Sequence, residues 1–521
     1  MAGLAVIGGY LCIALARLGY PGHLEILEDN SLVEVHRILA GQQIYAAPSA
    51  GYVPDGYPPL YFVVSAAAAG VLGQSYLPLR LVSLVASLAC FAVLGRLVQR
   101  ETGSRDAGLA AAGLLAGTYF AVGTWFDVGR VDSLFLAFSV AGLYAARWAC
   151  RTRGAIAVGL LLGAAFCTKQ SALAEGVTVL AVLALGPRRR LAAPATAAYA
   201  AVTGGSTVVL GLTSHGWYVY YVFQGMSQQG VSASNLGQFW IPELLPTLGL
   251  AIGAVLLAAR RTSPVLLAGC GALAVESFTA RAQPGSNIND LLPAYLAVAL
   301  LAGLAIGGQR PSVPAGGNGA VARAWITGIT RTSWIAWVAR WRRDGAGQWV
   351  PIAASALVVI QIGVLASGFR LGEAFPPKAD RAANQRLTAA ARALGGTVAI
   401  PADPGIAVLA GLPPTEDQVA AANVLNASDA NAKAMYWGSL ARAVSAQQYS
   451  AIITEYRRDL RGFPADLRRY YYRCPQAPVD GAVSVPFSAS SEPFADALPI
   501  SVWLPIGHGP SCASVARTLE S

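Results

Sequence analysis

The sequence has few charged residues and few cysteines, methionines and histidines. Only 12% of its 521 residues are charged, and it contains 7 cysteines, 3 methionines and 4 histidines. A soluble domain usually carries about 25% charged residues, so about half of the usual surface charge is missing. Phosphate-binding glycine motifs and metal-spaced His/Cys clusters are also lacking, so cytoplasmic nucleotide use has no support. With 55% hydrophobic residues and a mean hydropathy of +0.50, this composition predicts an integral membrane protein.

Long apolar runs are the dominant feature of the sequence, and several approach the roughly 20 residues needed to cross a bilayer. We predict eleven membrane helices, near residues 2–20, 80–98, 108–125, 133–148, 155–168, 171–186, 192–212, 242–259, 264–280, 291–308 and 350–368. The fold class is therefore a polytopic α-helical membrane protein.

Arginines gather in alternate loops, as the positive-inside rule expects of cytoplasmic segments. They occur in five loops, at 96–105, 147–153, 188–190, 260–261 and 309–349. This distribution places the N-terminus in the cytoplasm and residues 371–521 outside. It also accounts for the net charge of +10 without a nucleic-acid partner. The cytoplasmic loop 309–349 mixes tryptophans with arginines and predicts a helix on the inner leaflet.

Residues 60–74 form an apolar run that is too short for a comfortable span. If they crossed the bilayer, every later arginine cluster would face outward. We therefore predict an interfacial or re-entrant helix within the first external loop, residues 21–79. Pro58 and Pro59 leave Tyr57 extended and favour a helix start at Leu60.

The composition changes after Phe369. Residues 397–401 and 451–455 alternate as strands do, and helical patterns fit 378–394, 434–447 and 464–473. We predict two domains, a membrane domain of residues 1–370 and an extracytoplasmic α/β domain of residues 371–521. Cys474 and Cys512 are the cysteines of this polar part, and they can form a disulfide if it lies outside the cytoplasm.

The first external loop is acidic. Glu25, Glu34 and Asp55 have the ordinary interpretation of solvated carboxylates near a membrane surface. Glu28 and Asp29 are adjacent and directly follow the first span. They are candidates for a general base or for metal ligands.

Further charged residues lie in the other external loops. Asp127, Arg130 and Asp132 share one short loop and form either a structural Asp–Arg pair or part of a site. Lys169 stands between two apolar helices with no neighbouring carboxylate in the sequence, and Arg281 occupies a similar loop. These external cations are suited to hold a lipid phosphate.

The order of these features resembles the GT-C superfamily of membrane glycosyltransferases, in the branch of protein O-mannosyltransferases and aminoarabinose transferases. The resemblance runs through most of the chain, although each motif is short. It is carried by Glu28-Asp29, the run from Arg37 to Tyr45, Tyr57-Pro-Pro-Leu60, Gly129-Arg-Val-Asp132, Thr168-Lys-Gln170, and the external segments Pro401–Pro404 and Leu409–Pro414.

The resemblance implies transfer of a hexose or pentose, with inversion, from a polyprenyl-phosphate donor to a glycan, lipid or protein acceptor. Glu28 or Asp29 would then be the base. Lys169, Arg281 and Arg130 would hold the donor phosphate, and Asp127, Asp132 and Tyr57 would orient the acceptor or the cations. Some relatives bind a divalent cation, Mg²⁺ or Mn²⁺, for which Glu28, Asp29 and Asp132 are the candidate ligands. The expected location is the bacterial inner membrane, in cell-envelope synthesis.

Two other classes of protein remain open at this point. A transporter or flippase would line a substrate path with the same external Lys and Asp residues, and many transporters show inverted repeats. We find no such repeat and no charged residue near the middle of a predicted span. A non-catalytic assembly protein would bind a partner through residues 371–521, but it would leave the acidic first loop without a role.

Overall fold

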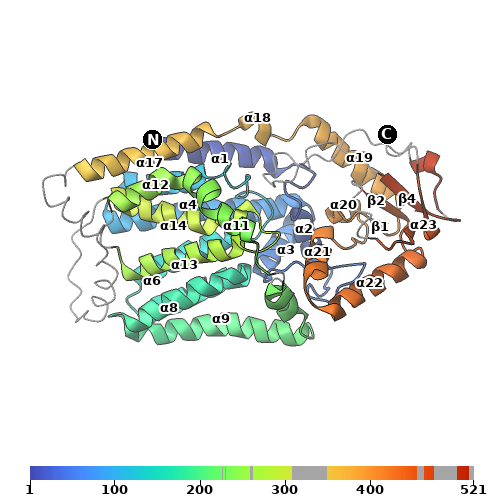
Figure 1. The fold of residues 1–521 in the computed structure, drawn as a ribbon, viewed down its shortest axis with the longest axis horizontal. Helices are drawn as coiled ribbons and strands as arrows, with labels where there is room; N and C mark the ends of the chain where they lie inside the picture. The colour runs from blue at the N-terminus through green and yellow to red at the C-terminus, as the bar shows by residue number, and fades with distance from the viewer. Residues whose placement is uncertain are drawn as a thin grey trace.

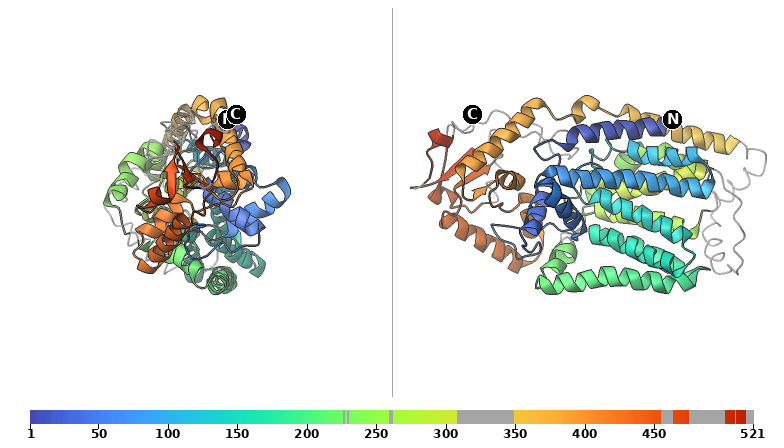
Figure 2. Two further views of the ribbon diagram at one scale, coloured as in Figure 1. Left: turned by 90° about the vertical axis from the view of Figure 1, so that its right-hand side faces the viewer. Right: turned by 180° about the vertical axis from the view of Figure 1, so that it is seen from behind.

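The structure is a computed structural model, and it describes residues 1–225, 227–228, 230–258, 262–307, 349–454, 463–474, 501–507 and 509–515. Long helices run side by side along most of the molecule, and the strands gather with α19–α23 at one end (Figure 1). The same division is visible from behind (Figure 2, right).

The long-helix part follows the apolar runs closely. Its helices are α1 (Ala2–Leu18), α4 (Tyr76–Thr102), α5 (Arg105–Gly117), α6 (Asp132–Trp148), α7 (Thr152–Thr168), α8 (Leu173–Leu185), α9 (Ala192–Thr213), α12 (Leu245–Leu257), α13 (Pro264–Arg281), α14 (Leu292–Ile306) and α17 (Trp349–Ser367). Each predicted span overlaps one of these helices, and together they confirm a polytopic helical fold.

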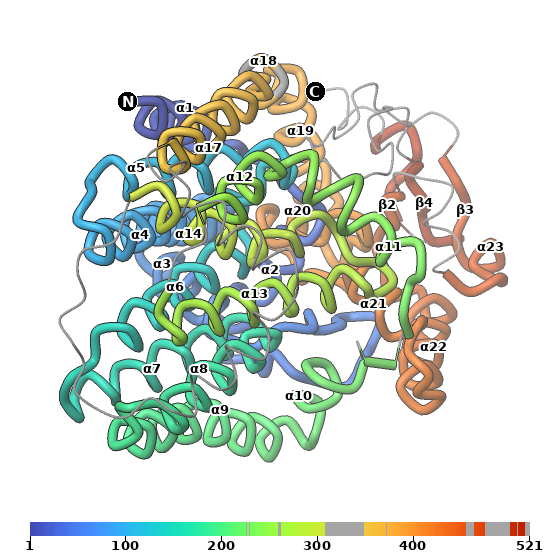
Figure 3. Tube along the Cα trace, turned by 60° about the vertical axis from the view of Figure 1, so that its left-hand side comes forward, coloured from blue at the N-terminus to red at the C-terminus, as the bar shows by residue number. Residues whose placement is uncertain are grey.

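Short elements connect these helices. They are α2 (Glu28–Leu39), α3 (Leu60–Leu72), η1 (Gln170–Ala172), η2 (Arg189–Leu191), α10 (Trp217–Val219), η3 (Tyr220–Gly225), α11 (Ala233–Gln238), η4 (Phe239–Leu244) and η5 (Ile288–Leu291). Helix α2 lies between the long helices and α20 (Figure 1), and α10 follows α9 at the lower edge of the tube view (Figure 3).

Within the described part of the chain, five helices are long and apolar enough to cross a membrane by length and composition, at Tyr76–Thr102, Arg189–Thr213, Ala233–Leu257, Ile288–Ile306 and Trp349–Ser367. The outer faces of these helices carry exposed apolar side chains. Val208 and Leu212 on α9 and Val359 on α17 are 59%, 73% and 55% exposed. Apolar surface of this extent suits contact with lipid. The side of the membrane on which each loop lies stays a prediction.

The predicted helix 108–125 is partly wrong, because α5 ends at Gly117 and turns follow. Gly123 and Thr124 have positive φ angles of 65° and 61°. A right-handed helix cannot continue through such residues. The resulting turns bring Asp127 and Arg130 into the protein interior.

The short helix α3 begins at Leu60, as the paired prolines predict, and has 13 residues. It packs on α2 and α4. The helix expected within loop 309–349 lies outside the described residues, apart from Trp349, which begins α17.

The C-terminal part contains α18 (Leu371–Ala374), α19 (Lys378–Leu394), α20 (Pro404–Ala410), α21 (Gln418–Asn426), α22 (Ala430–Ser445), α23 (Leu467–Tyr470), β1 (Val398–Ala399), β2 (Ala451–Thr454), β3 (Tyr471–Arg473) and β4 (Ser501–Pro505). The strand order is β1-β2-β4-β3, with β1 and β2 parallel and the other pairs antiparallel. This small sheet confirms the α/β class, although 464–473 is a short helix followed by a strand and not one helix. The domain boundary at residue 370 stays a prediction.

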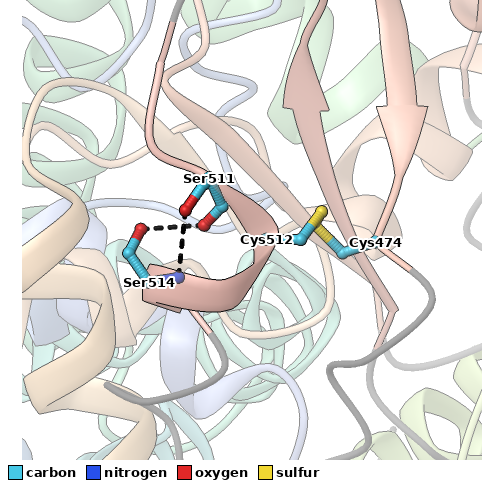
Figure 4. The surroundings of a disulfide bond; sticks show 4 residues. All are labelled: Cys474, Ser511, Cys512 and Ser514. Atoms are coloured by element: carbon cyan, nitrogen blue, oxygen red, sulfur yellow. Dashed lines mark hydrogen bonds between the residues drawn. A yellow bond between two sulfur atoms is a disulfide. The ribbon is translucent and has the colours of Figure 1, made fainter.

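Cys474 and Cys512 are joined by a disulfide beside this sheet (Figure 4). Cys474 follows β3, and its backbone N–H donates to the carbonyl of Val502 in β4. The bond therefore ties the last described segment to the edge of the sheet.

Glycine at position 159 permits close packing of α7 on α9, since a Cβ there would lie 2.2 Å from the carbonyl oxygen of Ala195. We expect Gly159→Ala to lower the stability by about 1–3 kcal/mol through overpacking. Gly204→Ala on α9 is the matched control, because nothing lies within 4 Å of its Cβ position. Thermal unfolding in detergent, followed by tryptophan fluorescence, measures both. Equal melting temperatures for the two variants would contradict this packing.

Candidate functional site

Ionisable side chains are buried where the loops of the long-helix part meet the C-terminal part. Glu25, Glu34 and Asp55 are 4%, 1% and 5% exposed. Their interpretation as solvated carboxylates is therefore wrong. Burial of a carboxylate is costly unless a cation or hydrogen bonds compensate it, so the partners of each group define the site.

Glu28 is held by Arg80 of α4. The guanidinium donates to both carboxylate oxygens, from Nε at 2.9 Å and from Nη2 at 2.7 Å. The backbone N–H groups of Leu24 and Gly129 also donate to Glu28. Burial alone would raise the pKa of Glu28, but Arg80 and these amides outweigh burial and lower it. A carboxylate with its oxygens so occupied is suited to positioning the loops around it.

Asp29 points to a different group of residues. Its Oδ1 accepts from the Tyr76 hydroxyl, and its Oδ2 lies 2.8 Å from Nδ1 of His23. The same Nδ1 lies 2.6 Å from Asp403. Adjacent residues Glu28 and Asp29 therefore belong to two separate clusters.

Arg130 is buried between carboxylates that it does not hydrogen-bond. Its Nε lies 3.7 Å from Glu25 and its Nη1 lies 3.9 Å from Asp55, both beyond ordinary hydrogen-bond distance. Neither nitrogen has a hydrogen-bond acceptor among the described residues. Its Nη2 donates to the Tyr57 hydroxyl at 3.2 Å. Buried N–H donors without acceptors are rare. Here they are suited to donate hydrogen bonds to an anionic ligand.

Glu25 is the acidic group closest to this guanidinium. Its Oε2 also accepts from the backbone N–H of Leu27 at 3.0 Å. Burial raises the pKa of Glu25 to about 7, although Arg130 opposes the rise. A carboxylate that titrates near neutrality is suited to general-base catalysis.

Asp55 and Glu34 lie beside each other in the same region. A Glu34 oxygen accepts from the backbone N–H of Asp55 at 2.9 Å. Burial raises the pKa of Glu34 to about 8. The remaining oxygens, Oε2 of Glu34 and Oδ2 of Asp55, accept no hydrogen bond from the described residues.

Lys169 has no neighbouring carboxylate in the sequence, but two carboxylates lie beside it in the structure. Its Nζ lies 2.9 Å from Asp132 and 3.2 Å from Asp290. Asp132 also accepts from Trp125 Nε1 and from the side chain of Asn289. The Tyr57 hydroxyl accepts from Nη2 of Arg130 and lies within the electrostatic influence of Lys169. Burial raises the pKa of its hydroxyl to about 12, while Arg130 and Lys169 lower it.

Two predicted site residues lie elsewhere. Arg281 contacts Glu243 with Nε and Nη2, and it donates to Ser286, instead of joining Lys169. Asp127 pairs with Arg17 at 3.4 Å and accepts from Tyr119. The Asp–Arg pair considered for this loop is therefore formed by Asp127 with a residue of α1.

The ligand set Glu28, Asp29 and Asp132 does not converge on one point, because each carboxylate has different partners. A metal ion that bridges these three residues does not fit the structure. Among the described residues, the one group with metal-ligand spacing is His23, Asp29 and Asp403.

Several residues of these clusters were not among the site residues predicted from the sequence. Arg80 begins a predicted span, and an arginine inside an apolar run was a usable signal. Asp290, Asn289 and Asp403 carry no comparable local signal. Glu175 in α8 and Glu276 in α13 are further buried carboxylates, and each lies nearer one end of its helix than the middle.

Known proteins resemble part of this sequence and the overall fold. Residues 56–215 match the family described as dolichyl-phosphate-mannose-protein mannosyltransferase. ArnT from Cupriavidus metallidurans bound to undecaprenyl phosphate has a similar structure, with a TM-score of 0.60 and 14% identity over 98% of this chain and 99% of that chain. The archaeal oligosaccharyltransferase AglB from Archaeoglobus fulgidus, in complex with an inhibitory peptide and a dolichol-phosphate, gives 0.50 and 12% over 98% and 77%. No curated protein matches the sequence.

This protein is therefore a multi-pass helical membrane protein whose fold is similar to the folds of ArnT and AglB. Its segment 56–215 resembles the mannosyltransferase family. That segment includes Tyr57, Arg130, Asp132 and Lys169.

The buried pair Glu28–Arg80 supplies a stability test. We expect Glu28→Gln and Arg80→Gln each to lower the free energy of unfolding by about 3–5 kcal/mol, because each leaves a buried group uncompensated. In the double variant the loss is smaller than the sum, with a coupling of about 2 kcal/mol. Denaturation by sodium dodecyl sulfate measures the cycle. The control is Arg147–Glu101, whose side chains are 28% and 15% exposed and whose coupling should be about 0–1 kcal/mol. A coupling no larger than this control would contradict the assignment.

Proposed function

We propose that this protein is an inverting glycosyltransferase that uses a polyprenyl-phosphate sugar donor at the extracytoplasmic membrane face. The observation that carries the proposal is Arg130, a buried guanidinium whose Nε and Nη1 have no hydrogen-bond acceptor among the described residues. A phosphate oxygen matches these donors in charge and geometry. The neighbours also support it, since ArnT and AglB were solved with undecaprenyl phosphate and dolichol-phosphate.

The reaction follows from the charges around Arg130. The acceptor hydroxyl oxygen attacks the anomeric carbon from the face opposite the phosphate, so a new C–O bond forms while the bond to the phosphate oxygen breaks. The phosphate leaves with the electron pair, and Arg130 stabilises the charge that develops on it. Lys169 contributes less, because Asp132 and Asp290 already offset its charge.

A carboxylate of the first external loop takes the acceptor proton. Glu28 and Asp29 are the candidates from sequence, but their contacts favour positioning roles. Glu25 fits better, because it lies beside Arg130 and has a pKa of about 7. Asp132 holds Lys169, and Tyr57 orients Arg130. A role in the bacterial cell envelope, with a glycan, lipid or protein acceptor, is part of the proposal.

The alternative function is transport of a lipid-linked or small polar substrate. The buried Glu175 and Glu276 favour it, because ionisable groups inside membrane helices often mark a transport path. Substrate movement across vesicles without sugar transfer would support this alternative.

The role of Arg130 is tested by transfer from defined undecaprenyl-phosphate hexoses and pentoses, using purified protein in nanodiscs. Release of undecaprenyl phosphate is the readout, so the acceptor can come from a mixture of envelope lipids and glycans. We expect Arg130→Gln to lower kcat/KM by about 10²–10³-fold, as for loss of one transition-state donor. Arg96→Gln, in an exposed residue of α4, is the matched control. Full activity of Arg130→Gln would contradict the phosphate assignment, and an equally large loss in Arg281→Gln would restore Arg281 to the site.

The role of Glu25 predicts a pH profile. Because the base must be ionised, kcat/KM should rise as the pH increases through about 7 and level off above it. Glu25→Gln should remove this rise of kcat/KM with pH and most of the activity. Glu28→Gln and Asp29→Asn, measured at equal folded concentration, are the comparison variants. If Glu25→Gln kept the rise with pH while Glu28→Gln or Asp29→Asn lost it, the base would be Glu28 or Asp29.

A further inference from the structure

Three side chains from distant parts of the chain meet outside the Arg130 and Lys169 clusters. His23 lies in the loop after α1, Asp29 in the first turn of α2, and Asp403 directly before α20. They are 5%, 0% and 0% exposed. One ligand atom from each lies within 4.8 Å of the others. Two carboxylates and an imidazole are thus buried together.

Hydrogen bonding alone does not account for this geometry. Nδ1 of His23 lies 2.8 Å from Asp29 Oδ2 and 2.6 Å from Asp403 Oδ1. A ring nitrogen carries a single hydrogen or a single lone pair, so it cannot donate well to both oxygens. Oδ2 of Asp29 is fully buried, and apart from this shared nitrogen no described residue donates a hydrogen bond to it. A buried oxygen aimed at the same point as two other ligand atoms is the arrangement of a cation site.

The surroundings of the cluster hold its members in place. Tyr76 of α4 donates its hydroxyl to Oδ1 of Asp29, which leaves Oδ2 facing His23 and Asp403. A hydrogen bond to the second oxygen of a ligating carboxylate is a common outer-sphere feature of metal sites. Gly405 is required here, because a Cβ at that position would collide with Asp29 Oδ1 and the Tyr76 hydroxyl.

We propose that His23, Asp29 and Asp403 bind a divalent transition-metal ion of the Zn²⁺ or Mn²⁺ kind. One imidazole nitrogen with two carboxylate oxygens suits these ions, whereas Mg²⁺ and Ca²⁺ prefer oxygen ligands alone. The charge of the ion matches the two carboxylates, which lie in a buried and poorly solvated position. This site is separate from the Arg130 cluster and does not depend on the proposed function.

The ion fastens the C-terminal part to the first external loop. Helix α20 packs on α2, and Val408 belongs to the apolar cluster of Leu32, Val35 and Tyr76. Metal binding adds its free energy to this contact, because the three ligands come together only when the two parts are joined. The site therefore stabilises the surface that borders Glu25 and Arg130.

The wild-type protein, purified without a polyhistidine tag, gives the direct test. The protein is stripped with EDTA, incubated with ZnCl₂, MnCl₂ or MgCl₂, desalted and analysed by mass spectrometry for metal. We expect about one Zn²⁺ or Mn²⁺ per chain and no Mg²⁺. Thermal unfolding should shift upward by several degrees with ZnCl₂ or MnCl₂ only. Failure to retain either ion, with no shift, would overturn the proposal and leave a protonated His23 between two carboxylates.

Asp403→Asn and His23→Gln test the ligands. Both should lose metal retention and the metal-dependent shift, whereas Asp106→Asn, an exposed carboxylate on α5, should keep both. Unchanged metal retention in Asp403→Asn and His23→Gln would overturn the site. If neither variant folds, the wild-type measurement alone decides. None of these readouts involves sugar transfer, so failure here is distinct from failure of the proposed glycosyltransferase activity.

Discussion

The buried ion pair of Arg80 and Glu28 is the interaction on which the rest of the site depends. Arg80 donates to the carbonyls of Tyr20 and Gly22 in addition to Glu28, which fixes the loop after α1 against α4. Glu28 accepts from the N–H of Gly129, the residue before Arg130. One pair of charges therefore sets the distance between the loop after α1 and the segment that carries Arg130. Because both charges are buried away from water, the pair is stable only when each of these hydrogen bonds of Arg80 and Glu28 is made.

The polar residues around this pair divide into three clusters with different tasks. Arg130 has two N–H donors without acceptors among the described residues, and it lies beside the carboxylates of Glu25 and Asp55. Lys169 is already compensated by Asp132 and Asp290. His23, Asp29 and Asp403 join the loop to the C-terminal part. Adjacent residues Glu28 and Asp29 serve different clusters because neighbouring side chains on α2 point in different directions.

Most of the fold could be predicted from the sequence, because bilayer-length apolar runs and arginine-rich loops are local signals. Helix α19 has the predicted bounds 378–394, and α3 begins where the paired prolines place it. The error at 108–125 arose because the run stays apolar beyond Gly117, while the backbone turns at Gly123 and Thr124. Hydropathy does not register such a turn.

The site was less predictable, because its contacts join residues far apart in the chain. Lys169 lacks an acidic neighbour in sequence, and its partner Asp290 comes from the loop after α13. Glu25 and Asp55 look like solvated loop residues until Arg130 is placed between them. Asp403 lies in a short proline-rich segment, and only the docking of α20 on α2 brings it to Asp29. The residue types of the site could be inferred from the sequence, but the partners of each residue could not.

The most direct test of the central claim is a cryo-electron microscopy structure of the protein in nanodiscs with undecaprenyl phosphate. The account predicts phosphate oxygens within about 3 Å of Nε and Nη1 of Arg130, with Lys169 on the same side of the phosphate. Density for the phosphate at another place, with Arg130 still between Glu25 and Asp55 and in contact with no ligand, would contradict it.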